Sequence, residues 1–134
     1  MSAADILTIR TFEELECWKQ CRALRRFITE TIIPVLPKEE RYRLGDQLLR
    51  AARSATANIA EGYGRFHYLD NAKFCSNSRG SCWEILDHLI AGYDEGFISA
   101  ELLERGRSLV ADAIKVLNGY MKYLKSAPAN TINQ

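Results

Sequence analysis

The stretch Leu44–Tyr68, LGDQLLRAARSATANIAEGYGRFHY, decides the fold that the rest of the chain must follow. Its apolar residues recur at intervals of three and four, as on one face of an α-helix. This stripe comprises Leu44, Leu48, Ala51, Ala52, Ala55 and Ile59. Because alanine is small, the stripe predicts that a neighbouring helix approaches closely. Gly62 and Gly64 follow, and since glycine tolerates the left-handed backbone of a C-terminal cap, we expect the helix to end there.

Two prolines divide the chain before this stretch. Apolar residues at helical spacing predict a first helix that starts near Leu15 and ends near Ile33, just before Pro34. Pro37 is followed by Lys-Glu-Glu, and proline with acidic residues is typical of the first turn of a helix. We therefore expect the second helix to begin at Pro37.

Two further helices follow the stretch. The third is predicted from about Leu69 to Asp94 and is stopped by Gly96, and its central Gly80 indicates close contact with another helix. The fourth begins after Ser99, a plausible N-terminal cap, and ends before Pro128. Four helices with short connections predict an all-α fold, an antiparallel up-down four-helix bundle.

The length and composition fit one such domain. The chain has 134 residues, of which 47% are hydrophobic, and a formal net charge of +1. We expect a flexible N-terminal arm at residues 1–11, the bundle at 12–125 and a flexible tail at 126–134. No run of about 20 apolar residues and no signal-peptide pattern is present, so we expect a cytoplasmic protein without a membrane partner. The near-neutral charge means that any nucleic-acid surface has to be local.

Catalytic and metal-binding signatures are missing from the sequence, which predicts a protein that is not an enzyme and has no cofactor. Four thiols could in principle meet inside a bundle, but they lack the C-x-x-C spacing of typical metal sites, and core packing is the simpler interpretation. These thiols are Cys17, Cys21, Cys75 and Cys82. A di-iron centre fails on ligand count, because His88 follows Glu84 by four residues and the required motif is Glu-x-x-His. The Glu84 and His88 spacing instead favours a pair on one helix face.

Basic and aromatic residues around the second helix are candidates for nucleic-acid binding. Arginines can contact phosphates, and aromatic rings can stack on unpaired bases. The candidates are Arg41, Arg43, Arg50, Arg53, Arg65, Tyr63 and Tyr68, with Phe66 and His67 beside them. Acidic residues lie among these arginines, so an ordinary solvated polar face is the alternative interpretation.

Apolar residues beyond the four core stripes suggest a second contact surface. Trp83, Ile90 and Phe97 widen the apolar face of the third helix, and Trp18 does the same on the first. A second apolar face favours self-association. The alternative is that these side chains are half exposed or lie under loops.

A set of residues spread along the chain resembles a known family, the small four-helix-bundle proteins encoded by intervening sequences of bacterial 23S ribosomal RNA genes. The matching residues are Phe12-Glu13-Glu14-Leu15, Trp18, Asp46-Gln47-Leu48, Arg50-Ala51-Ala52, Ser54, Asn58-Ile59-Ala60-Glu61-Gly62, Gly64-Arg65, Phe74, Arg79-Gly80-Ser81 and Glu84. The family is related to the accessory variability proteins of diversity-generating retroelements.

The resemblance implies a homopentamer without enzymatic activity that binds RNA or DNA, or a nucleic-acid enzyme. Together with the residues above, it leads to the hypothesis of a non-enzymatic, homo-oligomeric bundle that binds nucleic acid. The alternative is an adaptor or scaffold that presents its surface to a protein such as a reverse transcriptase.

Overall fold

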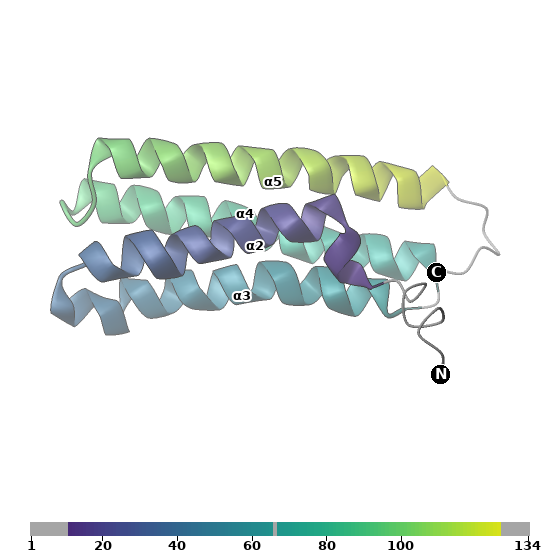
Figure 1. Ribbon diagram of the computed structural model, residues 1–134, viewed down its shortest axis with the longest axis horizontal. Helices are drawn as coiled ribbons and strands as arrows, with labels where there is room; N and C mark the ends of the chain where they lie inside the picture. The colour runs from purple at the N-terminus through teal and green to yellow at the C-terminus, as the bar shows by residue number, and fades with distance from the viewer. Residues whose placement is uncertain (1–10, 66, 127–134) are drawn as a thin grey trace, which may run out of the picture.

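The computed structural model describes residues 11–65 and 67–126. Within them the chain forms four long α-helices: α2 (Glu16–Phe27), α3 (Leu44–Tyr63), α4 (Tyr68–Asp94) and α5 (Ala100–Ser126). A 3-10 turn at Phe12–Glu14 precedes α2. A π-helical turn at Ile28–Ile32 and 3-10 turns at Ile33–Val35 and Lys38–Tyr42 connect α2 to α3. Consecutive long helices run in opposite directions (Figure 1). The predicted all-α, up-down bundle is thus confirmed.

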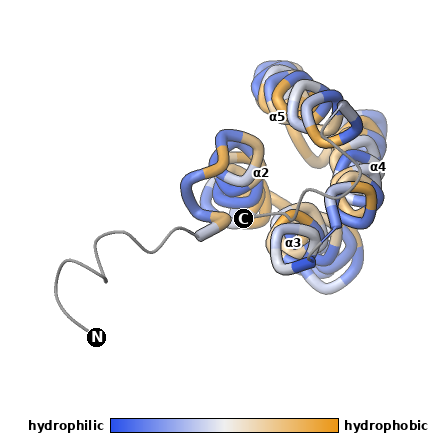
Figure 2. Tube along the Cα trace, turned by 90° about the vertical axis from the view of Figure 1, so that its right-hand side faces the viewer, coloured by the Kyte–Doolittle hydropathy of each residue, from blue (hydrophilic) through white to orange (hydrophobic). Residues whose placement is uncertain are grey.

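The four helices surround one core. In the end view of Figure 2, α2, α3, α4 and α5 follow one another around the bundle, and each of α2 and α4 contacts both α3 and α5. Leucine and isoleucine fill the centre: Leu24, Ile28, Ile32, Leu48, Ile59, Ile85, Leu89, Leu117 and Leu124 are fully buried. Burial of each such side chain stabilises the fold by about 1.5–3 kcal/mol. None of the described helices has the combination of length and hydropathy that a bilayer span requires.

The first helix reaches the predicted end, but not as a continuous α-helix. It changes at Phe27 to the π-helical turn, in which the Ile33 N–H donates to the Ile28 carbonyl, and then to a 3-10 turn. Pro34 explains the change, because its ring clashes with the carbonyl four residues earlier and it has no N–H to donate. The β-branched run from Ile28 to Ile33 further lowers the preference for a regular α-helix.

The second helix begins later than predicted. Pro37 leads only into the 3-10 turn, and α3 begins at Leu44 after a bend at Arg43 with φ −114° and ψ −89°. A Cβ atom added at the buried Gly45 would lie 3.3 Å from both the Glu40 carbonyl oxygen and Leu36 Cδ1. The 3-10 turn therefore packs back on the start of α3, which a single straight helix from Pro37 would prevent.

Gly62 and Gly64 end α3, but not through the left-handed backbone that the sequence suggested. Gly64 has φ −75°, and among the described residues Gly96 alone has positive φ, at 81°. Gly62 is needed for its size, because an added Cβ would lie 2.6 Å from Asn71 Oδ1 and 2.8 Å from Phe74 Cβ of α4. Gly96 does act as predicted: the Phe97 N–H donates to the Gly92 carbonyl at 2.8 Å, as in a Schellman cap.

Gly80 does not have the predicted role. A Cβ atom added there would meet no atom within 4 Å, so close helix packing inside the chain does not explain this glycine. The close approach of α3 and α4 instead occurs at Gly62 and at Ser78, whose hydroxyl donates to the Ala55 carbonyl at 2.7 Å.

The ends of the bundle follow the sequence closely. The Leu102 N–H donates to Ser99 Oγ at 3.1 Å, so the predicted cap of α5 is confirmed. Thr11 caps the first 3-10 turn by accepting the Glu13 N–H at 3.2 Å, and Ser126 is the last residue of α5. The rest of the predicted arm and tail lies outside the described residues.

Substitution of Gly62 by alanine tests the close approach of α3 and α4. Gly62→Ala is expected to lower the free energy of unfolding by about 1–3 kcal/mol, because the new methyl group overlaps Phe74 Cβ. Gly119→Ala in α5 is the matched control, since its Cβ meets nothing within 4 Å. It should raise the free energy of unfolding by up to about 1 kcal/mol through helix propensity. Urea unfolding followed by circular dichroism measures both; a stabilised Gly62→Ala variant would contradict this packing.

Candidate nucleic-acid interface

Most of the arginines predicted to contact nucleic acid are engaged within the chain. Arg50 pairs with Asp46 at 2.9 Å, and Arg43 lies 4.0 Å from Glu40. Arg65 pairs with Glu61 at 3.0 Å, and its guanidinium also lies 4.8 Å from the centre of the Phe74 ring. These acids stand three or four residues before their arginines, so the same helical spacing that lines up the arginines also neutralises them.

The other two predicted arginines differ from each other. Arg41 donates to the Pro34 carbonyl at 3.1 Å, which ties the 3-10 turn to the end of the first helical segment. Arg53 is exposed on α3 and forms no ion pair with any residue between 11 and 65 or 67 and 126. The five arginines thus do not form one cationic surface. Two of them precede α3, two lie on it and one follows it, and α3 alone is about 30 Å long.

A tyrosine cluster forms at the end of the bundle where α4 begins and α5 ends. The rings of Tyr68 and Tyr123 lie 6.1 Å apart, and those of Tyr120 and Tyr123 are stacked at 6.3 Å. Tyr120 also accepts a hydrogen bond from the buried Asn71 side chain at 3.0 Å. The interaction with the Tyr123 hydroxyl raises the pKa of Tyr68. Tyr123 is 57% exposed, so its ring is accessible beside the half-buried Tyr68.

The remaining aromatic candidates contribute less to a surface. Tyr63 is half-buried near the end of α3, and His67 is exposed at the start of α4. Phe66 lies outside the described residues. Of the aromatic residues predicted to stack on bases, Tyr68 is therefore the one that lies beside an exposed ring, that of Tyr123.

Sequence reasoning missed a cationic groove between α4 and α5. Arg79 of α4 and Lys122 and Lys125 of α5 line a groove of about 480 Å³ together with Asn118, Met121 and Ser126. Arg79 Nη1 donates to Asn118 Oδ1 at 2.7 Å, which fixes the guanidinium between the two helices. None of the three cations forms an ion pair in the described part of the chain, and no carboxylate lines the groove.

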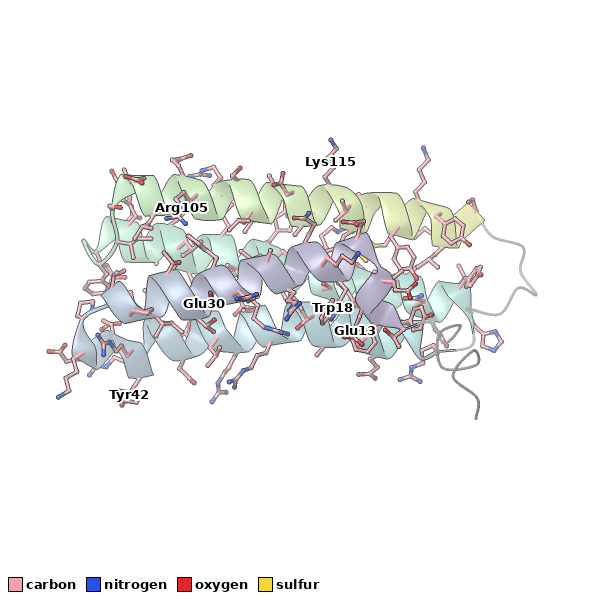
Figure 3. The ribbon with its side chains drawn as sticks, in the orientation of Figure 1. Glu13, Trp18, Glu30, Tyr42, Arg105 and Lys115 are labelled. Atoms are coloured by element: carbon pink, nitrogen blue, oxygen red, sulfur yellow. The ribbon has the colours of Figure 1, made fainter. Side chains whose placement is uncertain are left out.

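A signal for this groove is present in the sequence. From Ala113 to Ser126 the chain carries Lys115, Lys122 and Lys125 but no acidic residue. Figure 3 shows Lys115 projecting outward from α5, so the outer side of this helix extends the positive charge. The contribution of Arg79 depends on the register of α4 against α5, which a helix-by-helix interpretation does not provide.

The four residues predicted to form an oligomer interface come from α2, α4 and the segment after α4, and they differ in exposure. Trp18 packs at 5.3 Å against Phe12, while Ile90 and Phe97 are half-buried against the core. Trp83 differs, since it is 55% exposed on α4. It follows Arg79 by one helical turn, so the two residues are neighbours on the surface of α4.

The four thiols gather inside the bundle, as the core interpretation expected. All are free and buried, and Cys21 Sγ of α2 lies 3.8 Å from Cys82 Sγ of α4. No group of three or more histidine, cysteine or acidic side chains in residues 11–65 and 67–126 is placed to hold a metal ion. Burial raises the pKa of Cys17 and of Cys75 to about 12.

The predicted pair of Glu84 and His88 is present, with His88 Nε2 at 3.1 Å from Glu84 Oε2.

Comparison with known proteins identifies the family. The model of the 23S rRNA-intervening sequence proteins matches residues 13–119. The chain belongs to this family. The intervening-sequence protein fold is also seen in a crystal structure of a protein of unknown function from the S23 ribosomal protein family of Bacteroides thetaiotaomicron. That structure superposes with a TM-score of 0.72 at 17% identity and covers 79% of this chain and 95% of the other. No curated protein sequence matches this intervening-sequence protein.

The raised thiol pKa values predict how stability depends on pH. Their ordinary value is 9.0, so the folded state favours the protonated thiols, and the stability they contribute is complete below about pH 9 and lost as the pH rises toward 12. Each thiol is expected to lower the free energy of unfolding by up to about 1.4 kcal/mol per pH unit in that window. Urea unfolding at about pH 8 and about pH 10.5 measures the loss.

A double variant, Cys17→Ala with Cys75→Ala, is the control for this pH dependence. It should show a smaller decrease between the two pH values than the natural chain. The buried Tyr120 hydroxyl, whose pKa is also raised by burial, accounts for part of the decrease that remains. An unchanged decrease in the double variant would assign the effect to other groups.

Proposed function

We propose that this protein is a non-enzymatic, nucleic-acid-binding bundle that holds the phosphate backbone in the groove between α4 and α5. One observation carries the proposal: Arg79, Lys122 and Lys125 converge on a groove without a carboxylate or an ion pair among the described residues. Phosphate contacts by lysine and arginine release counterions and supply most of the affinity in such complexes. Three cations that have no carboxylate partner among the described residues are suited to this role.

The proposed phosphate-binding site is the α4–α5 groove and not the ion-paired arginines along α3, and the reason is energetic. An arginine that is already paired with a carboxylate has to give up that contact, or share it, before it binds a phosphate. Arg43, Arg50 and Arg65 are in this situation. No carboxylate among the described residues that line the α4–α5 groove competes in this way.

The tyrosine cluster supports a strand with unpaired bases as the ligand. Tyr123 follows Lys122 directly in the last turns of α5, so an exposed ring lies next to a phosphate-binding charge. Base stacking on an aromatic side chain contributes about 1–3 kcal/mol per base and tolerates any sequence. The family name associates its members with an intervening sequence of 23S rRNA, which makes fragments of that RNA the first ligands to test.

Replacement of the two groove lysines tests the proposal. The double variant Lys122→Gln with Lys125→Gln is expected to weaken binding to a single-stranded 23S rRNA fragment by at least about tenfold and to reduce the slope of log affinity against log salt by about one per lysine. Fluorescence anisotropy over a range of salt concentrations measures both quantities. Arg50→Gln, which removes a cation already paired with Asp46, is the matched control and should change both much less.

Two outcomes would overturn this function. If Arg50→Gln weakens binding as much as the lysine variant, the groove is not the site. If the natural chain shows no salt-dependent binding to RNA or to duplex DNA, nucleic-acid binding itself is wrong. The adaptor hypothesis, with a reverse transcriptase or a similar enzyme as partner, then becomes the function to pursue.

Self-association is the second part of the proposed function. A tryptophan that is 55% exposed in the middle of a long helix is a candidate contact between copies, and Gly80 one turn earlier leaves open space beside it. Of the four predicted interface residues, Trp83 is the one whose side chain is mostly exposed, which supports this region as the contact. Five copies remain the expectation from the family resemblance.

Trp83→Ala tests the contact between copies. It is expected to lower the mass measured by light scattering toward that of one chain, 15.2 kDa, while circular dichroism shows the same helical content. Tyr42→Ala is the control, because Tyr42 is 83% exposed on the 3-10 turn before α3, away from Trp83. A mass that stays unchanged in Trp83→Ala would exclude this contact.

A further inference from the structure

A second groove with unpaired cations lies on the opposite side of the bundle, between α2 and α3. It has a volume of about 300 Å³, at the lower end of the range for small-molecule sites. Phe12 and Trp18 line one part of it, and Arg25, Arg53 and Thr56 line another. Figure 3 shows Trp18 where α2 faces α3. The groove thus combines aromatic rings and guanidinium groups within a single small volume.

The two arginines of this groove are positioned but not neutralised. Arg25 Nη1 donates to Thr56 Oγ1 at 2.7 Å, and Thr56 in turn donates to the Arg53 carbonyl at 3.2 Å. A guanidinium has five N–H donors, so most of those on Arg25 stay available. Neither arginine forms an ion pair with a described residue, in contrast to Arg43, Arg50 and Arg65.

The aromatic part of the groove is also fixed by its neighbours. Trp18 is half-buried and meets Phe12 edge to face, with ring centres 5.3 Å apart and planes at 65°. The guanidinium of Arg22 lies 5.7 Å from the centre of the indole, which adds a third cation near the groove. Between the rings and the arginines, α3 contributes only the small side chains of Ala57 and Ala60. These small side chains leave room for the part of a ligand that would join an aromatic ring, bound at Trp18, to an anion, bound at the arginines.

We propose that the groove binds a nucleoside monophosphate, with the base against Trp18 and Phe12 and the phosphate monoester on Arg25 and Arg53. Guanidinium groups bind phosphate oxygens with paired, charge-assisted hydrogen bonds, and nucleobases stack on aromatic rings. The sugar lies over Ala57 and Ala60. The ligand is either a free nucleotide or the 5′-phosphorylated end of a strand, since both present the same ring and monoester. This site is separate from the α4–α5 groove and does not depend on it.

Calorimetric titration of the full-length chain with AMP tests the site. Saturable binding is expected with AMP, and much weaker binding with adenosine, which lacks the anion, and with inorganic phosphate, which lacks the ring. Arg53→Gln should weaken AMP binding by about tenfold or more. This variant is preferred because the Arg53 side chain forms no hydrogen bond or ion pair with any described residue, so its loss should not disturb the fold.

Matched variants separate this site from the rest of the protein. Arg50→Gln removes a neighbouring, ion-paired arginine from the same helix and should leave AMP binding unchanged. Lys122→Gln with Lys125→Gln should also leave it unchanged, so failure of the α4–α5 proposal and failure of this one are distinguishable. Equal binding of AMP and adenosine, or an Arg53→Gln variant with the affinity of the natural chain, would overturn the proposal.

Fluorine NMR with 5-fluorotryptophan gives a second readout. The chain has two tryptophans, so two resonances are expected. AMP should shift the resonance of Trp18 and leave that of Trp83 in place, because Trp83 lies on α4 outside the groove. A shift of the Trp83 resonance alone would place the ligand elsewhere and overturn the assignment. A 5′-phosphorylated oligonucleotide that shifts Trp18 at lower concentration than AMP, while its 5′-hydroxyl form does not, identifies the strand end as the source.

Discussion

The close contact of α3 and α4 is the constraint on which the rest of the bundle depends. Gly62 brings the end of α3 against Phe74 Cβ, and the Ser78 hydroxyl donates to the Ala55 carbonyl farther along the same pair of helices. Alanine and glycine on α3 permit this approach, and it fixes the register of α4. Register in turn decides which side of α4 faces α5, and therefore that Arg79 meets Asn118. The cationic groove is in this sense a consequence of small residues on a different helix.

The pairing of charges explains why two grooves are functional candidates and the ion-paired arginines along α3 are not. On α3 the acids stand one turn before their arginines, so Arg50 and Arg65 are neutralised by their own helix. On α5 the acids end at Asp112 and lysines continue to Lys125. The last lysines also compensate the negative end of the α5 dipole, a role worth only about 0.3–1 kcal/mol each at a surface. That interaction does not prevent them from binding a phosphate.

The sequence predicts the helices well because apolar spacing and caps are local properties. The end of α4, which Gly96 stops, and the start of α5, which Ser99 caps, depend on residues a few positions apart. Both were predicted correctly. The role of Gly62 was not predicted. Its backbone does not have positive φ, and its small size matters only because α4 packs against it. The same holds for the candidate sites: Arg79 and Arg25 acquire a role through Asn118 and Thr56 of other helices. Interhelical register, which single-helix patterns do not contain, separates the predicted features from the missed ones.

The position of the two grooves limits how they can act together. Because α2 and α3 adjoin on one side of the bundle and α4 and α5 on the other, a short ligand reaches only one groove of a given chain (Figure 2). Trp83 follows Arg79 by one turn of α4, so the proposed contact between copies would bring a neighbouring chain close to Arg79. The α2–α3 groove is lined by residues of the turn before α2, of α2 and of α3, on the other side of the bundle, so the proposed nucleotide would bind independently of the proposed contact at Trp83.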